Sequence, residues 1–372
     1  MKCMSKFFAL IALLWASNTF ALDQIIYPYY DVRTAGMGGV FLTTGLYDQN
    51  FFGNPARVTA NPGFKLTLFD PTIEANSGMI SNAPKIINTA TSGGGTSNII
   101  NLLSGLSGSD LHGRIELVAP AVYFNVKKLY FGIGILTSEQ LDLDPRNNYS
   151  VGTQSYLDIS PAVTVGYKFL KDDALSIGTT IHESIRASTP ASMDLGQFLG
   201  GGFSLSNFLK DGMDTDFDVG ATYNLPWKVW NTTFTTGAAV NNVLGGTYSS
   251  PLPVKLGSIT GPPLAQPTSI GVGISAVRPS FWKFAQTTAA LEFTDFGNNA
   301  YGSLFRQIHL GAETNWGILA FRGGINQGYW TAGLGINLYV LTIDLASYGE
   351  EMGLNAGDIE DRRYMARIAL QI

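Results

Sequence analysis

Few side chains of this chain are suited to acid–base or nucleophilic chemistry. Its histidines are His112, His182 and His309. Glu183 follows His182, but successive side chains of a strand point to opposite faces, so this pair cannot act on one substrate. No spacing of serine, histidine and acid marks a catalytic triad, and the acidic run 211–218 lacks the ligand positions of a calcium loop. We therefore expect no enzyme, no cofactor and no metal site, and we interpret residues 211–218 as a solvated junction.

Polar and apolar residues alternate with a period of two, and this alternation indicates the elements that position these side chains. At the carboxyl end, in DRRYMARIALQI, Arg363 and Arg367 share one parity, whereas Tyr364, Ile368 and Leu370 share the other. This period is the signature of a strand with two unlike faces. The pattern predicts a strand that is polar on one side and apolar on the other.

Fourteen segments are predicted to be strands of this kind. Their approximate ranges are 63–75, 114–125, 129–138, 155–169, 174–187, 214–223, 230–241, 267–277, 283–295, 305–314, 317–325, 331–338, 341–348 and 362–372. The connections between them alternate in length, as in the long connection 76–113 and the short turn 126–128 that follows it. A membrane barrel requires such alternation, because all turns of one kind face the same side of the membrane.

The composition agrees with a membrane barrel. Charged residues are only 14% of the chain, below the ~25% of an ordinary soluble domain, whereas glycines (43) and aromatic residues (12%) are abundant. After residue 21 no apolar run approaches the ~18 residues of a membrane helix. In lipid every strand N–H and C=O needs a partner, so the last strand must pair with the first. We predict an all-β fold, an antiparallel transmembrane β-barrel of about 14 strands.

Polar residues on the inward parity are predicted to line the lumen. A lipid-facing arginine at the membrane midplane costs roughly 2–4 kcal/mol, so Arg363 and Arg367 are expected to point inward, towards Asp344 on the preceding strand. The full candidate lining is His182, His309, Glu313, Arg322, Asp344, Arg363 and Arg367. Two roles stay open for this set: contact with a substrate, or structural pairing with one another and with the segment before the first strand.

Residues 1–21 have the features of a secretory signal peptide. Lys2 and Lys6 precede an apolar run at 7–15, and a small-x-small cleavage site follows. The single cysteine, Cys3, lies in this segment, so the mature chain would contain none. Without the two lysines the chain keeps 21 basic against 28 acidic residues, a net charge of about −7, which indicates no nucleic-acid partner.

The segment 33–62 is neither a strand nor a hydrophilic linker. Its glycines allow tight turns, and Asn54 and Pro55 read as the cap and first position of a helix. The pattern A-G-M-G-G, then Asp48, then N-P-A is its most distinctive feature. Its residues are Gly36, Gly38, Gly39, Asp48, Asn54, Pro55 and Ala56.

This pattern resembles the amino-terminal hatch of the long-chain fatty acid transporter family (FadL/TodX-like) and of the related PorV-type barrels. Residues 119–135 and 160–181 are similar to the early hairpins of that superfamily, and 333–353 is similar to the PorV-type end. The resemblance implies a hatch at 22–62 that plugs a fourteen-stranded barrel at 63–372. The chain departs from the pattern in its final residue, Ile372, and in its shorter loops.

The resemblance implies a channel of a Gram-negative outer membrane that passes small hydrophobic or amphipathic molecules and is gated by the hatch. Its expected partners are outer-membrane lipid and the substrate, and the protein is expected to be a monomer. The alternative is a PorV-type accessory barrel that serves exported proteins. Pro120 and Pro161 each remove a hydrogen-bond donor from a strand, which marks either a lateral opening in the wall or a kink at the rim.

Overall fold

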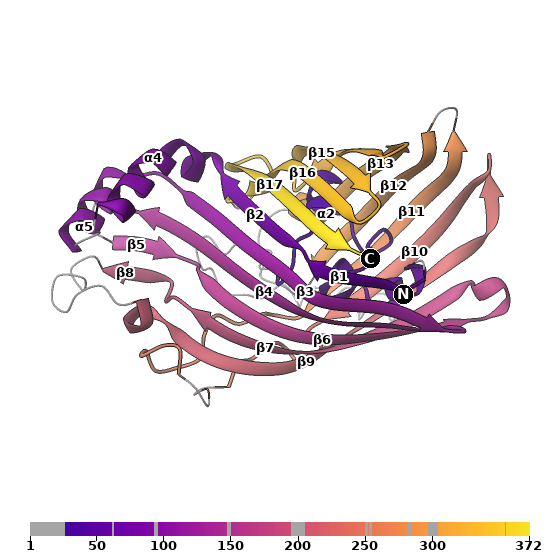
Figure 1. Ribbon diagram of the computed structural model, residues 1–372, viewed down its shortest axis with the longest axis horizontal. Helices are drawn as coiled ribbons and strands as arrows, with labels where there is room; N and C mark the ends of the chain where they lie inside the picture. The colour runs from indigo at the N-terminus through magenta and orange to yellow at the C-terminus, as the bar shows by residue number, and fades with distance from the viewer. Residues whose placement is uncertain are drawn as a thin grey trace, which may run out of the picture.

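The computed structural model describes residues 27–61, 63–92, 96–146, 150–194, 205–249, 252, 255–281, 284–296, 304–353 and 355–372. The predicted signal peptide, residues 1–21, lies outside these ranges. One closed antiparallel sheet surrounds the segment 27–61 (Figure 1). The predicted barrel is therefore confirmed.

Fourteen strands form the wall, and each predicted segment overlaps with one of them. The first is interrupted at Asp70 into β1 (Lys65–Phe69) and β2 (Pro71–Asn76). The others are β3 (Leu111–Val126), β4 (Leu129–Pro145), β6 (Tyr156–Phe169), β7 (Leu175–Ser188), β9 (Lys210–Val229), β10 (Thr232–Asn241), β11 (Ser269–Phe281), β12 (Phe284–Phe296), β13 (Ile308–Trp316), β14 (Leu319–Asn326), β15 (Tyr329–Leu338), β16 (Leu341–Glu351) and β17 (Glu360–Gln371). Consecutive wall strands pair, so the topology is a simple up-and-down meander.

The barrel closes between its last and first strands. Arg363 of β17 lies opposite Asn76 of β2, and Gln371 lies opposite Thr67 of β1. Two backbone hydrogen bonds between Leu66 and Ile372, of 2.7 and 2.9 Å, complete the seam. Closure satisfies the backbone groups that an open edge would expose to lipid.

The two faces of the wall differ as the period of two predicts. On β17, Tyr364 and Ile368 are 45% and 53% exposed, whereas Arg363 and Met365 are each 3% exposed. Other strands repeat this arrangement, with aliphatic and aromatic side chains outside and threonine, serine, acids and arginines inside. The apolar outer surface is the one that contacts lipid in a transmembrane barrel.

The two ends of the barrel carry different connections. Tight turns join β3 to β4, β13 to β14 and β15 to β16 at the end where the carboxyl terminus lies (Figure 1). The opposite end carries α4 (Ser77–Thr91), α5 (Thr96–Gly105), and the pair β5 (Ser150–Thr153) and β8 (Ser192–Asp194), which extends the wall. Short 3-10 turns occur at η2 (Lys171–Asp173), η4 (Leu205–Phe208) and η5 (Leu304–Gln307).

None of the helices in the described ranges is long and apolar enough to cross a membrane.

Candidate functional site

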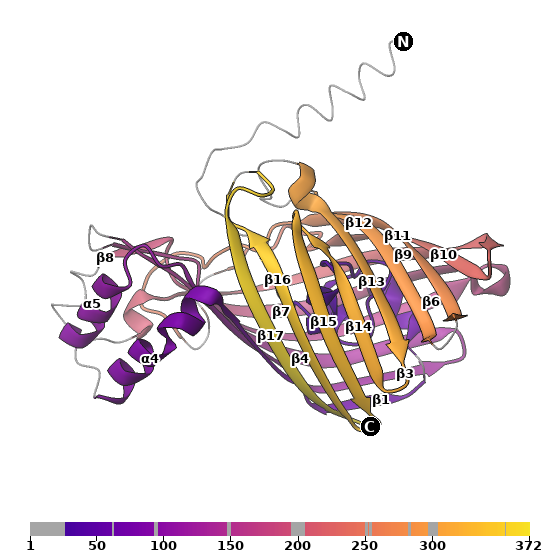
Figure 2. The same ribbon diagram turned by 90° about the horizontal axis from the view of Figure 1, so that it is seen from above.

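The amino-terminal segment 27–61 occupies the lumen. It contains α2 (Val32–Gly36), α3 (Gln49–Phe52) and η1 (Pro55–Ala60), and Figure 2 shows these elements enclosed by the strands. We call this segment the hatch. α2 packs on β15 and β16, and η1 packs on β6, β7 and β9, so the hatch touches opposite parts of the wall.

The predicted helix entry of the hatch is observed, with a 3-10 rather than an α geometry. Asn54 caps η1 by accepting a hydrogen bond of 3.1 Å from Ala56 N, and Pro55 takes the first position. The amide nitrogen of Asn54 donates 2.7 Å to Leu42 O, which ties two turns of the hatch together. Asn54 and Ala56 have no exposed surface.

The glycines of the motif are contact points with the wall. Gly36 lies against β15, where an added Cβ would be 3.0 Å from Gly333 Cα. Gly38 O is 3.1 Å from His309 Nδ1, and Gly39 packs on the same ring. A carbonyl can only accept, so Nδ1 of His309 carries a proton. His309 therefore binds the hatch directly.

Replacing Gly38 with alanine is expected to loosen the hatch. Gly38 has a φ of +70°, and an added Cβ would lie 2.8 Å from Ile325 N and closer still to Leu310 O. The left-handed conformation alone costs alanine about 1–2 kcal/mol, and the clash with wall backbone adds to it. Limited proteolysis should cut the hatch of Gly38→Ala much faster than that of the wild type.

Gly63→Ala is the matched control for this variant. Gly63 has a φ of +68°, but an added Cβ there meets nothing within 4 Å. Gly63→Ala therefore carries the cost of the left-handed backbone without the clash between the added Cβ and the wall. Equal cleavage rates for Gly38→Ala and Gly63→Ala would contradict the role of Gly38 as a contact point.

A buried carboxylate of the wall holds the middle of the hatch. Glu292 of β12 is fully buried and accepts hydrogen bonds from Phe41 N (2.7 Å), Leu42 N (2.8 Å), Thr43 N (2.9 Å) and Thr43 Oγ1 (2.8 Å). Both oxygens are thus satisfied by the hatch. Sequence reasoning missed Glu292, although its alternation with Ala290 and Thr294 places it on the inner face.

Arg367 is the centre of an ion cluster between hatch and wall. Its guanidinium lies 3.2 Å from Asp48 and 3.7 Å from Asp31 of the hatch, 2.5 Å from Asp70 and 3.5 Å from Asp344. Burial raises the pKa of Asp48 to about 7; nearby Asp70 adds to this rise, and Arg367 opposes it. One cation thus faces four carboxylates.

A second ion cluster adjoins the first. Glu313 binds Arg33 of the hatch at 2.9 Å and Arg322 at 2.7 Å, and Arg322 also binds Asp344 at 2.6 Å. Asp344 therefore belongs to both clusters, because it contacts Arg367 of the first and Arg322 of the second. Together the clusters line a polar cavity of about 220 Å³ near the tight-turn end of the barrel.

The remaining predicted lining residues lie apart from these clusters. Arg363 binds Asp361 at 2.7 Å and lies 3.7 Å from Glu74. Glu74 in turn binds His112, whose other ring nitrogen is 2.6 Å from Asp142. The predicted lining lacks His112, because β3 begins three residues earlier than predicted. Extending the inward parity of Arg114 and Glu116 back along β3 identifies it.

His182 lies between an aromatic ring of the hatch and buried acids of β9. It is 4% exposed, and its ring packs on Phe52 of the hatch with centroids 5.5 Å apart. Nε2 lies 3.5 Å from Asp218 Oδ1, and neither ring nitrogen completes a hydrogen bond with the described part of the protein. His182 is thus a polar group that a molecule in the lumen could engage.

Pro120 and Pro161 lie in one row across the wall. The register of β3 with β4 shifts between Val118 and Ala121, so Pro120 lies opposite Ile135 of β4. Ile135 in turn pairs with Pro161 of β6. The β6–β7 ladder then skips the positions of Pro161 and Glu183. Proline cannot donate to a ladder, so two prolines 41 residues apart weaken the wall at one level.

The wall is also thin at this row. On the inner side it presents Gly132, Gly134, Ala121 and Ala162, and the ring of Phe51 from the hatch covers Gly134. Outside lies an apolar groove of about 550 Å³, the proline groove, which is lined by Leu66, Pro120, Ala121, Val122, Ile133, Gly134, Ile135, Pro161, Ala162, Val163, Ile181, His182, Glu183 and Thr215. The lining includes residues from both faces of the wall.

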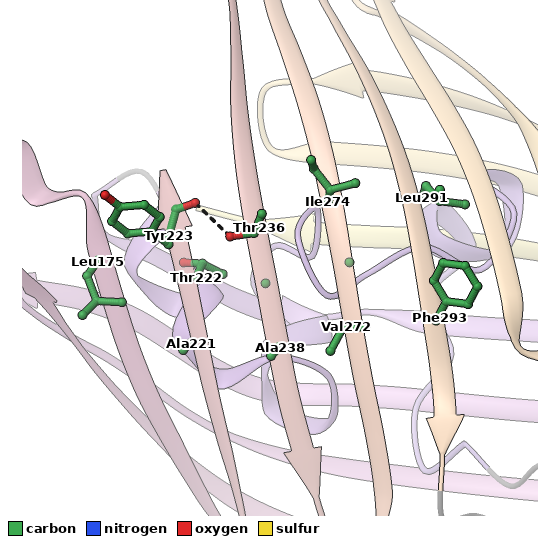
Figure 3. Close-up of a pocket in the computed structure, with 12 residues that line it drawn as sticks. Leu175, Ala221, Thr222, Tyr223, Thr236, Ala238, Val272, Ile274, Leu291 and Phe293 are labelled. Atoms are coloured by element: carbon green, nitrogen blue, oxygen red, sulfur yellow. Dashed lines mark hydrogen bonds between the residues drawn. The ribbon is translucent and has the colours of Figure 1, made fainter. Parts of the chain in front are cut away.

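A second outer groove, of about 520 Å³, lies over β7 and β9–β12. Figure 3 shows Ala221 and Ala238 on its floor between Leu175, Ile274 and Phe293. The β10–β11 ladder behind it is continuous from Thr233 to Asn241. The β11–β12 ladder shifts register between Ile270 and Val272 at one edge of this groove, but the described lining of the groove contains no proline.

Residues 242–249 and 255–268, in the connection between β10 and β11, pack on the start of β9 at the end of the barrel opposite the tight turns. Asp211 accepts from Leu256 N and Gly257 N, Asp216 accepts from Leu244 N and Gly246 N, and Asp218 accepts from Asn242 N; all five bonds are 2.6–3.0 Å long. These three aspartates are at most 3% exposed. The interpretation of 211–218 as a solvated junction is therefore wrong for Asp211, Asp216 and Asp218, which bind the connection between β10 and β11, whereas Asp214 is half-buried.

No group of three or more metal-binding side chains occurs in the ranges that the structure describes.

Comparison with solved structures gives proteins of the same fold. The chain is similar to the toluene transporter TodX of P. putida, with a TM-score of 0.51 and 12% identity over 93% of this chain and 98% of that one. It is also similar to the monoaromatic hydrocarbon channel CymD, with a TM-score of 0.50 and 14% identity over 96% and 98%. A FadL homologue of Pseudomonas aeruginosa aligns with a TM-score of 0.48 and 10% identity over 94% and 99%.

No family model and no curated protein matches the chain. At these identities the structural likeness establishes the fold. This chain has the barrel fold of TodX and CymD, as the resemblance of its hatch motif implied.

Proposed function

We propose that this protein is an outer-membrane channel for small hydrophobic or amphipathic molecules, with residues 22–62 as its gate. TodX and CymD are named as a toluene transporter and a monoaromatic hydrocarbon channel, which supports the proposal by analogy of fold. The observation that carries it is local: the thin part of the wall lies between an apolar cluster in the lumen and an apolar groove outside.

The lumenal cluster is built jointly by hatch and wall. Tyr29 and Phe51 of the hatch pack on Tyr123, Leu136 and Ala162, and all five side chains are at most 3% exposed. Displacing the hatch would leave an apolar recess directly behind the proline groove. Burial of its apolar surface in this recess stabilises a hydrophobic molecule, and the molecule need not cross water on its way from the recess to the groove.

The axial route is less suitable for such a molecule. On the tight-turn side of the hatch, this route passes through the polar cavity of about 220 Å³. The charged groups in the lining of this cavity include Asp31, Asp48, Arg33, Lys65 and Arg322. An apolar solute would have to displace water from these ions, which is costly. Exit sideways into the membrane through the row of Pro120 and Pro161 is therefore the favoured path.

The gate can be tested by fixing the hatch with a disulfide. An ideal Cβ at Gly237 of β10 lies 2.9 Å from Thr43 Cγ2, so cysteines at these two positions are within reach of each other. The only natural cysteine is Cys3. The double variant Thr43→Cys/Gly237→Cys would be expressed in a Gram-negative host that lacks hydrophobic-solute transporters of its own, and uptake of labelled toluene would be measured.

We expect uptake with the wild type, loss of uptake when the double variant is oxidised, and recovery after addition of a reductant. The single variant Thr43→Cys controls for the lost hydroxyl. Uptake equal to that of the empty host would refute the channel. In that case co-purification with exported proteins would favour the accessory role. Uptake that persists with the disulfide formed would refute gating by the hatch.

A further inference from the structure

Glu183 is a charged residue on the outer, apolar face of the wall. On β7 it has the same parity as Ile177, Ile181 and Ile185, which flank it in the outward row. It lines the proline groove and is half-buried. A carboxylate in such a row is costly in lipid, so its presence calls for a reason.

The described part of the structure gives Glu183 no hydrogen bond and no ion pair. Its cross-strand neighbours are Thr215 on β9 and, across the interrupted ladder, Pro161 on β6. The side chain thus stands at the interruption of the β6–β7 ladder, here termed the gap, without a cation to neutralise it. The lining of the groove contains no lysine or arginine among the described residues.

The inner side of the same gap is also acidic. His182, adjacent in sequence, points inward, with Asp218 at 3.5 Å and no completed hydrogen bond within the described ranges. Asp216 and Asp218 are buried on β9 beside it. A molecule that passes the gap therefore meets carboxylates on both faces and one histidine, whose Nδ1 has no hydrogen-bond partner in the described ranges.

We infer that Glu183 makes this exit selective for neutral hydrophobic molecules, including alcohols and phenols that can donate a hydrogen bond to it, and excludes carboxylates. A hydroxyl group can donate to the Glu183 carboxylate and engage the His182 ring, whereas an anionic headgroup is repelled inside a wall of low dielectric constant. This inference rests on the proposed function and adds a class of substrate to it.

The test compares two probes of one chain length. Labelled 1-decanol and labelled decanoate are offered at neutral pH to the transporter-deficient host that expresses the full protein, and initial uptake rates are measured above the empty host. For the wild type we expect decanol to enter about tenfold faster than decanoate, which corresponds to about 1.4 kcal/mol of discrimination. Glu183→Gln should raise decanoate uptake about tenfold and leave decanol uptake within about twofold.

Glu139→Gln is the matched control. Glu139 is another outward carboxylate, on β4 opposite Leu157, but it does not line the groove. This variant should keep the wild-type preference. Glu183→Lys should reverse the preference and favour decanoate, which supplies a second, independent variant.

The outcomes separate the two proposals. Equal uptake of both probes by the wild type, or an unchanged ratio in both Glu183 variants, would overturn the selectivity while the channel stands. Uptake of neither probe would overturn the selectivity, and the channel would fall with it only if toluene uptake also equalled that of the empty host.

Discussion

Glutamine in place of Glu292 is expected to release the middle of the hatch from the wall. The carboxylate accepts four hydrogen bonds from Phe41, Leu42 and Thr43. A glutamine amide has one oxygen, and its NH₂ group would face backbone N–H donors, so two of these bonds are lost. Bonds to a charged group are worth about 1.5–3 kcal/mol each, and the expected loss in hatch docking is about 3 kcal/mol.

Hydrogen exchange of the purified protein in detergent measures this loss. Amides 41–43 should exchange about a hundredfold faster in Glu292→Gln, because each 1.4 kcal/mol is a factor of ten. Amides of β3 and β4 should keep their protection, since the wall is intact. Glu139→Gln again serves as the control, because its side chain faces outward. Unchanged exchange at 41–43 would show that Glu292 does not hold the hatch.

Removing Arg367 is expected to destabilise the barrel itself. The guanidinium binds Asp70 through two nitrogens and lies within 3.7 Å of Asp31, Asp48 and Asp344. Arg367→Gln leaves these carboxylates buried without their shared cation. Breaking a buried ion pair typically costs about 3–5 kcal/mol, so the unfolding temperature should fall markedly.

Arg362 provides the control on the same strand. It faces outward, binds Glu360 and stacks on Trp330 at 3.9 Å, so Arg362→Gln should cost no more than about 1 kcal/mol. Adding Asp70→Asn to Arg367→Gln removes one stranded charge and should restore part of the stability. The measurement is thermal unfolding followed by circular dichroism. Equal unfolding temperatures for Arg362→Gln and Arg367→Gln would contradict the central role of Arg367.

The strands were predictable because alternation is a local property. The opposite parities of Arg363 and Arg367 on one side and Tyr364 and Ile368 on the other can be read from one segment, without knowledge of other strands. The same is true of the other strands along the chain. The ends of strands were less accurate: β9 runs from Lys210 to Val229, well beyond the predicted 214–223. The two ends of β9 are held by pairing with β10 and with Ser249 of the connection that follows β10. The local sequence pattern carries no information about these contacts.

The partners of the inward residues were not predictable in the same way. Parity places Glu292 and His112 on the inner face, but their partners lie about 250 and about 30–40 residues away. The acids at 211–218 illustrate the same point, because a backbone loop that no local pattern reveals turns them from solvated into buried groups.

The sequence by itself determined a closed barrel of about fourteen strands and the two unlike faces of those strands, because lipid leaves no sheet edge unpaired and disfavours charge on the outer face. Only the tertiary structure decided which wall residues hold the hatch, and that Pro120, Pro161 and Glu183 meet at one level of the wall. The reason is physical: side-chain parity is set by neighbours in the chain, whereas register and packing are set by the closure of the whole sheet around its plug.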